Sequence, residues 1–95
     1  MIACYILDTP GFDKFYIGAT QDDVIARLKK HNHKAYGNTS TSFTSDWELF
    51  LVITCTKYSQ AINIERHVKK MKSKTYIRTL RQFPEMAENL LLQYS

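Results

Sequence analysis

The first twenty residues constrain the fold most, because they have the pattern of a β-hairpin. Residues 2–7 are continuously apolar, as expected for a short buried strand. The sequence Asp-Thr-Pro-Gly at 8–11 contains a proline–glycine pair that is typical of a turn. Residues 15–19 are a second strand-like run, rich in aromatic and β-branched side chains. The chain is therefore expected to open on two antiparallel strands, with their register left open because the turn is longer than two residues.

A helix is expected to follow the hairpin, over about residues 22–31. Thr20 or Asp22 can cap its N-terminus, and acidic residues in the first turn suit the positive end of the helix dipole. Its expected buried stripe consists of Val24, Ile25 and Leu28. Arg27 and His31 lie four residues apart, so they share a face of this helix that is offset from the apolar stripe.

The second half of the chain predicts one more strand and further helices. Residues 32–46 are rich in Asn, Ser, Thr and Gly and are interpreted as a loop, and an apolar third strand follows over 47–55. Ser59 is the expected N-cap of a helix over about 60–73. Its apolar positions follow helical spacing and are Ala61, Ile64, Val68 and Met71.

Two short helices are expected at the end of the chain. Thr75 would cap one over 76–82, and Pro84 would open the last one, which ends near Gln93. The element order β-β-α-β-α-α-α predicts the α+β class, with a small antiparallel sheet covered by helices. The sequence has no internal repeat or linker, and 95 residues suffice for one modest core, so a single domain over 1–95 is predicted.

The cysteines and the apolar runs bear on the cellular location. Cys4 and Cys55 lie in separate apolar runs, without the Cys-x-x-Cys spacing of a zinc or redox site. Buried free thiols in a reducing compartment are the simplest interpretation. The sequence has no signal-peptide pattern and no apolar run of about 18 residues. A cytoplasmic location without membrane insertion is therefore predicted.

The positive charge is concentrated in residues 57–82. The chain has a net charge of +4, and this segment holds eight Lys or Arg residues against a single acid, Glu65. A solvated helix face explains such a segment without any function, whereas a contact surface for a nucleic-acid backbone explains why the basic residues gather. The second interpretation assigns contact with the phosphate backbone to Lys69, Lys70, Lys72 and Lys74.

Five residues are candidates for chemistry, although each also has a structural explanation. Tyr5 and Tyr16 lie on the paired strands, where tyrosine is common. Arg27 is explained as a solvated side chain, and His31 as a residue favoured near a helix C-terminus. Glu65 can pair with a lysine four residues later. Taken one at a time, these residues leave both interpretations open.

The order of these residues resembles that of the GIY-YIG endonuclease superfamily. The first two motifs are Ala-Cys-Tyr at 3–5 and Tyr-Ile-Gly at 16–18. The third is Arg-Leu-Lys-Lys-His-Asn at 27–32, and the fourth is Ala-Ile-Asn-Ile-Glu-Arg at 61–66. The resemblance covers about residues 2–80. The chain is similar to short, stand-alone bacterial members related to the N-terminal nuclease domain of the repair endonuclease UvrC. The resemblance implies a three-stranded antiparallel sheet flanked by helices.

The resemblance also implies a metal-dependent endonuclease that hydrolyses DNA phosphodiester bonds, one strand per site. Glu65 would be the only protein ligand of one Mg²⁺ (or Mn²⁺) ion, with water and phosphate oxygens completing the shell. Tyr16 or Tyr5 would be the general base, with Tyr16 preferred. Because the unperturbed pKa of a tyrosine hydroxyl is about 10, the base would need help from a nearby cation or from hydrogen bonds at neutral pH. Arg27 would clamp the scissile phosphate. His31 would orient the water, relay its proton or contact the phosphate.

Several positions depart from the family pattern. Ala3 and Cys4 replace the glycine and isoleucine of the first motif. Ala19 stands where some members have a lysine, and Ile77 lies near the place of a common asparagine. A catalytically degenerate nucleic-acid-binding module of the same fold is therefore the alternative function, and a protein-interaction domain is a third. DNA is the expected partner, RNA stays open as a substrate, and the loop over 33–46 is expected to flank the site.

Overall fold

A three-stranded antiparallel sheet organises the molecule. The computed structural model describes residues 1–33 and 44–95. The strands are β1 (Ala3–Thr9), β2 (Lys14–Thr20) and β3 (Glu48–Thr54), in the order β2-β1-β3. The helices are α1 (Val24–Asn32), α2 (Tyr58–Met71), α3 (Lys74–Gln82) and α4 (Pro84–Gln93). The predicted element order and α+β class are confirmed. The predicted loop over 32–46 lies mostly outside the described residues, and its first residue, Asn32, is the last residue of α1.

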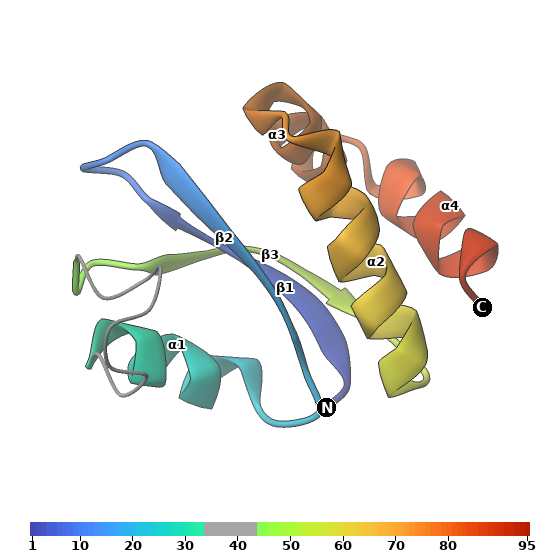
Figure 1. Cartoon of the computed structure of the whole chain (residues 1–95), viewed down its shortest axis with the longest axis horizontal. Helices are drawn as coiled ribbons and strands as arrows, with labels where there is room; N and C mark the ends of the chain where they lie inside the picture. The colour runs from blue at the N-terminus through green and yellow to red at the C-terminus, as the bar shows by residue number, and fades with distance from the viewer. Residues whose placement is uncertain (34–43) are drawn as a thin grey trace.

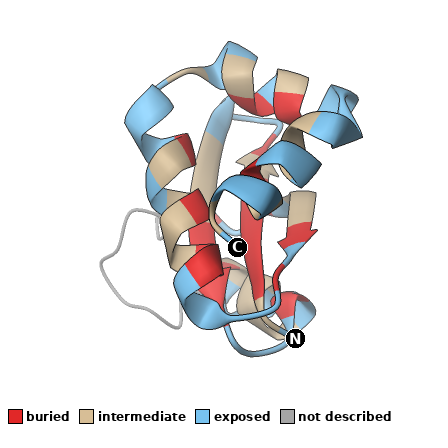
Figure 2. Cartoon of the chain, turned by 90° about the vertical axis from the view of Figure 1, so that its right-hand side faces the viewer, coloured by how far each residue is buried: buried red, intermediate tan, exposed pale blue. Residues whose placement is uncertain are grey.

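The helices cover the two faces of the sheet separately (Figure 1). Helix α1 packs against β1 and β3 on one face, and α2 packs mainly against β2 and β1 on the other, with α3 and α4 beside it. The central strand β1 is buried over almost its whole length, and the buried parts of α2 and α3 face the sheet (Figure 2). Strand β1 therefore supplies side chains to both cores.

Alternation along β1 divides the core into two clusters. Cys4 and Ile6 point toward α2 and meet the buried apolar positions of that helix, Ala61, Ile64 and Val68. Tyr5 and Leu7 point the other way and pack with Val24 of α1 and with Trp47. The register fixes which β2 residues join each cluster, because Tyr5 lies opposite Gly18 and Cys4 lies opposite Ala19. Tyrosine thus enters the α1 face of the sheet, and cysteine enters the α2 face.

The capping residues differ from those predicted for three helices. Asp23 caps α1, where its side chain accepts from the backbone N–H of Ile25. Ser73 caps α3 in place of Thr75. Helix α2 starts one residue before Ser59 and has no side-chain cap bond. A capping side chain accepts from the backbone N–H two or three residues after it, so a shift of one residue in the helix start changes which residue is the cap.

Two residues predicted to lie in apolar stripes are exposed instead. Ile25 in α1 and Met71 at the end of α2 are each 46% exposed. In α1 the inward face is formed by Val24, half-buried Leu28 and buried His31, so the histidine takes the place that the apolar pattern gave to isoleucine. Both cysteines are buried and free, as predicted.

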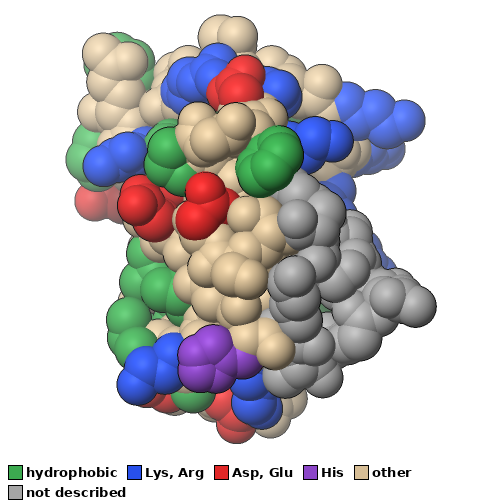
Figure 3. Space-filling view, turned by 90° about the vertical axis from the view of Figure 1, so that its left-hand side faces the viewer, with side chains coloured by type: hydrophobic (Ala, Val, Ile, Leu, Met, Phe, Trp, Pro, Cys, Tyr) green, Lys and Arg blue, Asp and Glu red, His purple; other side chains and the backbone are tan. Residues whose placement is uncertain are grey.

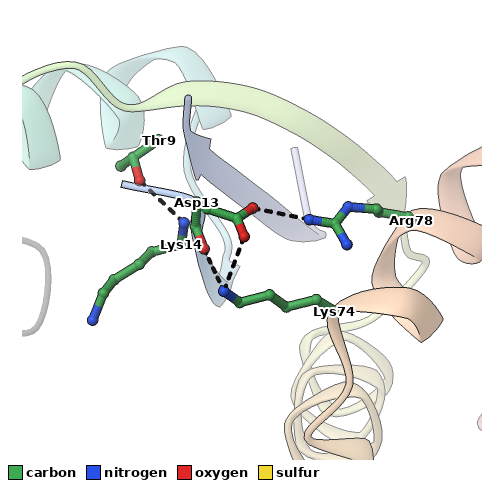
Figure 4. Close-up of polar contacts among 5 residues, drawn as sticks. All are labelled: Thr9, Asp13, Lys14, Lys74 and Arg78. Carbon is green, nitrogen blue, oxygen red and sulfur yellow. Dashed lines mark hydrogen bonds and ion pairs between the residues drawn. The ribbon is translucent and has the colours of Figure 1, made fainter. Parts of the chain in front are cut away.

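The β1–β2 turn is fastened to α3 by charged side chains (Figure 4). Asp13 has a positive φ of 50° and accepts from Lys74 at 3.3 Å and from Arg78 at 2.9 Å. Lys74 also donates to the backbone carbonyl of Asp13 at 2.6 Å. These pairs are exposed, so they stabilise the fold by about 0–1 kcal/mol each. Lys74, predicted to contact DNA, therefore also anchors the turn.

The basic segment does not form a uniform surface. Arg78 and Arg81 lie over the rings of Phe15 and Phe50, with guanidinium-to-centroid distances of 5.7 Å and 4.7 Å. At the end of the molecule that carries the β1–β2 turn, acidic and basic side chains are interspersed (Figure 3). Part of the segment thus has a structural explanation.

Among the described helices, none has both the length and the apolar character needed to cross a membrane.

Candidate active site

Gly18 allows Tyr5 to lie flat against strand β2. A Cβ atom at Gly18 would lie 2.6 Å from Cζ and 2.7 Å from Oη of Tyr5. Tyr5 is 2% exposed, so its ring is enclosed by other residues and does not lie in open solvent. The glycine of the Tyr-Ile-Gly motif is therefore required by the tyrosine of the motif on the neighbouring strand.

We predict that Gly18→Ala destabilises the fold by about 1–3 kcal/mol, because the added methyl overpacks a site filled by an aromatic ring. Gly11→Ala is the matched control, since its Cβ would make an ordinary contact at 3.4 Å in an exposed turn. Chemical denaturation of the two variants and the parent measures the difference. Equal stability of the two variants would contradict this account of Gly18.

Two tyrosines and a histidine form an aromatic cluster on the α1 face. The Tyr5 hydroxyl is 3.2 Å from Nε2 of His31. The Tyr16 and His31 ring centroids are 4.6 Å apart, and those of Tyr5 and Tyr16 are 6.2 Å apart. Tyr5 and His31 are buried, whereas Tyr16, on the edge strand, is only half-buried. Of the two candidate bases, Tyr16 is therefore the one that a substrate can reach more easily.

His31 is held as a neutral imidazole. Burial lowers its pKa below the ordinary 6.5, and the nearby positive charge of Arg27 lowers it further. A neutral imidazole can accept a hydrogen bond on one ring nitrogen, which a charged one cannot. His31 can therefore accept from the Tyr5 hydroxyl at neutral pH.

This shift predicts a loss of stability in mild acid. Below pH 6.5 the unfolded chain binds a proton at His31 that the folded chain does not bind, so unfolding becomes more favourable as the pH falls. The penalty is absent above the unfolded pKa and stops growing below the lowered folded pKa. We expect His31→Gln to remove this part of the pH dependence, measured by urea unfolding across the window. The same substitution at an exposed neighbour, His33→Gln, is the matched control.

Arg27 is oriented by a threonine at the end of β2. Its Nε donates to Thr20 Oγ1 at 3.1 Å, and the same oxygen accepts from the backbone N–H of Asp22 at 2.9 Å. Thr20 is fully buried, so the position of the guanidinium is fixed relative to the strand. Thr20 was predicted to be a possible helix cap, and the structure gives it this orienting contact instead.

Asn32 joins the end of α1 to the start of β3. Its amide donates to the Trp47 carbonyl at 2.9 Å and accepts from the Trp47 N–H at 2.6 Å, as a neighbouring strand would. The Trp47 ring lies 6.4 Å from that of Tyr16. Sequence reasoning gave no role to this pair, although Asn32 directly follows the histidine of the third motif.

Glu65 extends from α2, on the opposite face of the sheet from the aromatic cluster. Its side chain is 19% exposed and pairs with Lys69 at 3.1 Å. Burial raises the pKa of the Cys4 thiol to about 12, with further contributions from Cys55 and from the Glu65 carboxylate. Ile64, the neighbour of Glu65, packs in one cluster with Cys4 and Ala19, whereas Tyr5 and Tyr16 belong to the cluster on the other face of the sheet.

Strand β2 nevertheless brings Arg27 and Glu65 to the same end of the sheet. Arg27 is bound to Thr20, the last residue of β2. Glu65 follows Ile64 in α2, and Ile64 packs in one cluster with Cys4 and with Ala19, the residue before Thr20. Since β2 is at an edge of the sheet, the two charged side chains flank the end of an edge strand from opposite faces.

The match to a family model decides what this arrangement belongs to. The model of the GIY-YIG catalytic domain matches residues 1–78 of the 95-residue chain. The chain belongs to the GIY-YIG family. No match was found among curated proteins or among solved structures. The predicted family is thus confirmed. Membership indicates a nuclease in general, with DNA as the kind of substrate, and the nucleases of this family generally depend on divalent metal ions.

The metal-binding side chains of this GIY-YIG domain suit magnesium only if water molecules supply most of the ligands. In residues 1–33 and 44–95, no group of three or more His, Cys, Asp or Glu side chains comes together as a metal site. Magnesium retains several water molecules and is often bound by one or two carboxylates. The half-buried Glu65 carboxylate fits that mode of binding, and its ion pair with Lys69 orients it.

Proposed function

We propose that this protein is an endonuclease that hydrolyses one DNA strand beside the end of β2, with a single Mg²⁺ or Mn²⁺ ion held by Glu65. The proposal rests on the bond of Arg27 to Thr20 on one face of the sheet, and on the packing of α2, the helix that carries Glu65, against Cys4 and Ala19 on the other. A phosphate bound along this edge would meet a guanidinium from one face of the sheet and a carboxylate-held cation from the other. That arrangement suits a reaction in which negative charge builds up on phosphate oxygens.

Each residue of the site has a distinct task in the proposed reaction. Arg27 clamps the scissile phosphate through two parallel hydrogen bonds. Tyr16, acting as its phenolate, would take the proton of the attacking water and become the neutral phenol; it is the more exposed tyrosine of the cluster. His31 and Tyr5 hold the Tyr16 ring in place from the buried side. When bound, the divalent ion stabilises the charge of the phosphate and of the leaving oxygen.

A cleavage panel tests the proposal. Purified protein is incubated with supercoiled, linear, single-stranded and branched DNA, in Mg²⁺, in Mn²⁺ and in EDTA. Nicked or cut products that need the ion are the expected result. Failure to cleave any of these DNA forms with either ion would overturn the proposal, and cleavage of RNA in a parallel lane would widen its substrate class.

Two observations favour a second candidate, a GIY-YIG module that binds nucleic acid without cutting it. Lys69 occupies the Glu65 carboxylate, and Ala19 stands where some members have a lysine. This candidate predicts DNA binding that weakens with salt and is not reduced by loss of the Glu65 charge. Cleavage in the panel above decides between the two. A cytoplasmic location and a role in DNA repair stay predictions in either case.

A further inference from the structure

A pocket of about 250 Å³ lies between β2 and the junction of α2 with α3. The apolar part of its lining consists of Phe15, Ile17, Val68 and Ile77. Phe15 and Ile17 flank Tyr16 in the strand, so their side chains point to the opposite face of the sheet. The pocket and the proposed base are therefore back to back on the same edge strand.

Three lysines surround the mouth of this apolar pocket. Lys69, Lys72 and Lys74 contribute to its lining and are all exposed at the surface. Lys69 and Lys74 share their charge with Glu65 and Asp13, whereas Lys72 has no ion pair with the described residues. A ligand that suits both the apolar walls and the lysines at the mouth needs a flat apolar body with negative charge beside it.

We propose that this pocket takes one unpaired base of a DNA strand, while the neighbouring phosphates contact the three lysines. The pocket is smaller than the sites of drug-sized ligands, which are about 300–1,000 Å³, so it suits a single base. Bases stack on aromatic side chains whatever their sequence, and Phe15 supplies a ring in the pocket wall. A base inside an intact duplex cannot reach such a pocket.

The inference rests on the proposed function and names its substrate class. Lys69 belongs both to the pocket and to the Glu65 ion pair, so the pocket is about one helical turn from the proposed metal ligand. A strand with its base in the pocket would pass its phosphates toward the end of β2. The substrate is therefore DNA with unpaired nucleotides next to the cleavage site, such as a flap, an overhang or a branch.

Binding measured in EDTA tests the pocket apart from any cleavage. The probes are fluorescent duplexes with a short single-stranded overhang, either with normal bases or with abasic nucleotides that keep every phosphate. We expect the overhang with bases to bind about tenfold more tightly than the abasic one, through the stacking that only a base can provide. Equal affinities, or an absence of binding to both probes, would overturn the pocket proposal whether or not the protein cleaves DNA in Mg²⁺.

A pair of phenylalanine variants locates the effect. Phe15→Leu removes the ring from the pocket, while Phe50→Leu removes the ring packed against it at 5.0 Å, outside the pocket. We expect Phe15→Leu to abolish the preference for bases and Phe50→Leu to retain it, with thermal unfolding as the check on folding. Loss of the preference in both variants, or in neither, would contradict a base bound at Phe15.

A pair of lysine variants reports on the phosphates. Lys72→Gln should weaken the binding of both probes alike. It should also lower the slope of log affinity against log salt by the amount expected for about one phosphate contact. Lys57→Gln, an exposed lysine at the other end of α2, should leave the slope unchanged. A slope unaffected by Lys72→Gln would place the backbone elsewhere and overturn the proposed path of the strand.

Discussion

Glu65→Gln is expected to lower the rate of Mg²⁺-dependent DNA cleavage on the order of a thousandfold. Glutamine keeps the size and helix propensity of the side chain but loses the charge that would hold the cation. The loss removes electrostatic stabilisation of a transition state in which charge builds up on phosphate oxygens. Single-turnover cleavage at saturating protein measures this loss apart from any change in DNA affinity.

DNA affinity and the free energy of unfolding should change little in Glu65→Gln. The Glu65–Lys69 pair is partly exposed, with side chains 19% and 50% accessible, so its loss costs at most about 0.5 kcal/mol. Because Lys69 becomes free to contact a phosphate, DNA affinity at low salt should stay equal or rise. Glu88→Gln, an exposed glutamate on α4, makes the same charge change away from the site. Full cleavage activity in Glu65→Gln would show that this carboxylate does not hold the ion.

The elements could be predicted from the sequence because each has a strong local signal. The hairpin has two apolar runs around Pro10 and Gly11, and the order of elements along the chain followed from such patterns. Caps were harder, since Asp22 and Asp23 are chemically alike and only the true helix start decides between them. Ile25 was assigned to the core because apolar periodicity identifies the buried face of a helix only approximately. The orientation of α1 on the sheet decides which residues of that face are covered.

The site was predictable as a set of residues but not as an arrangement. Tyr5, Tyr16, Arg27 and His31 are drawn together by the strand register and by α1, which local patterns do not encode. The Asp13–Lys74 pair spans 61 positions, and the pocket beside β2 joins β2 to the α2–α3 junction. Such contacts depend on how distant elements pack. The order of motifs named the family, whereas the placement of Glu65 across the sheet from the tyrosines needed coordinates.

The hydroxyl groups of the two tyrosines should contribute very differently to cleavage. Tyr16→Phe is expected to slow it by about 10²- to 10⁴-fold, the range for loss of a general base. Tyr5→Phe removes the hydrogen bond to His31 and should cost about 0.5–1.5 kcal/mol of stability, with a drop in cleavage of about tenfold or less. The difference follows from burial, because Tyr5 is 2% exposed and Tyr16 lies half-buried on the edge strand.

Single-turnover rates at saturating protein separate the two roles. If Tyr16 is the base, Tyr16→Phe should lower the rate of the chemical step by the larger factor, while Tyr5→Phe should leave most of that rate in place. Both phenylalanine variants preserve the ring contacts with His31 at 4.6 Å and 6.2 Å, so each isolates a hydroxyl group rather than the packing of the cluster. A larger loss of cleavage in Tyr5→Phe than in Tyr16→Phe would transfer the role of base to Tyr5, and Tyr16 would then only wall the site beside Trp47.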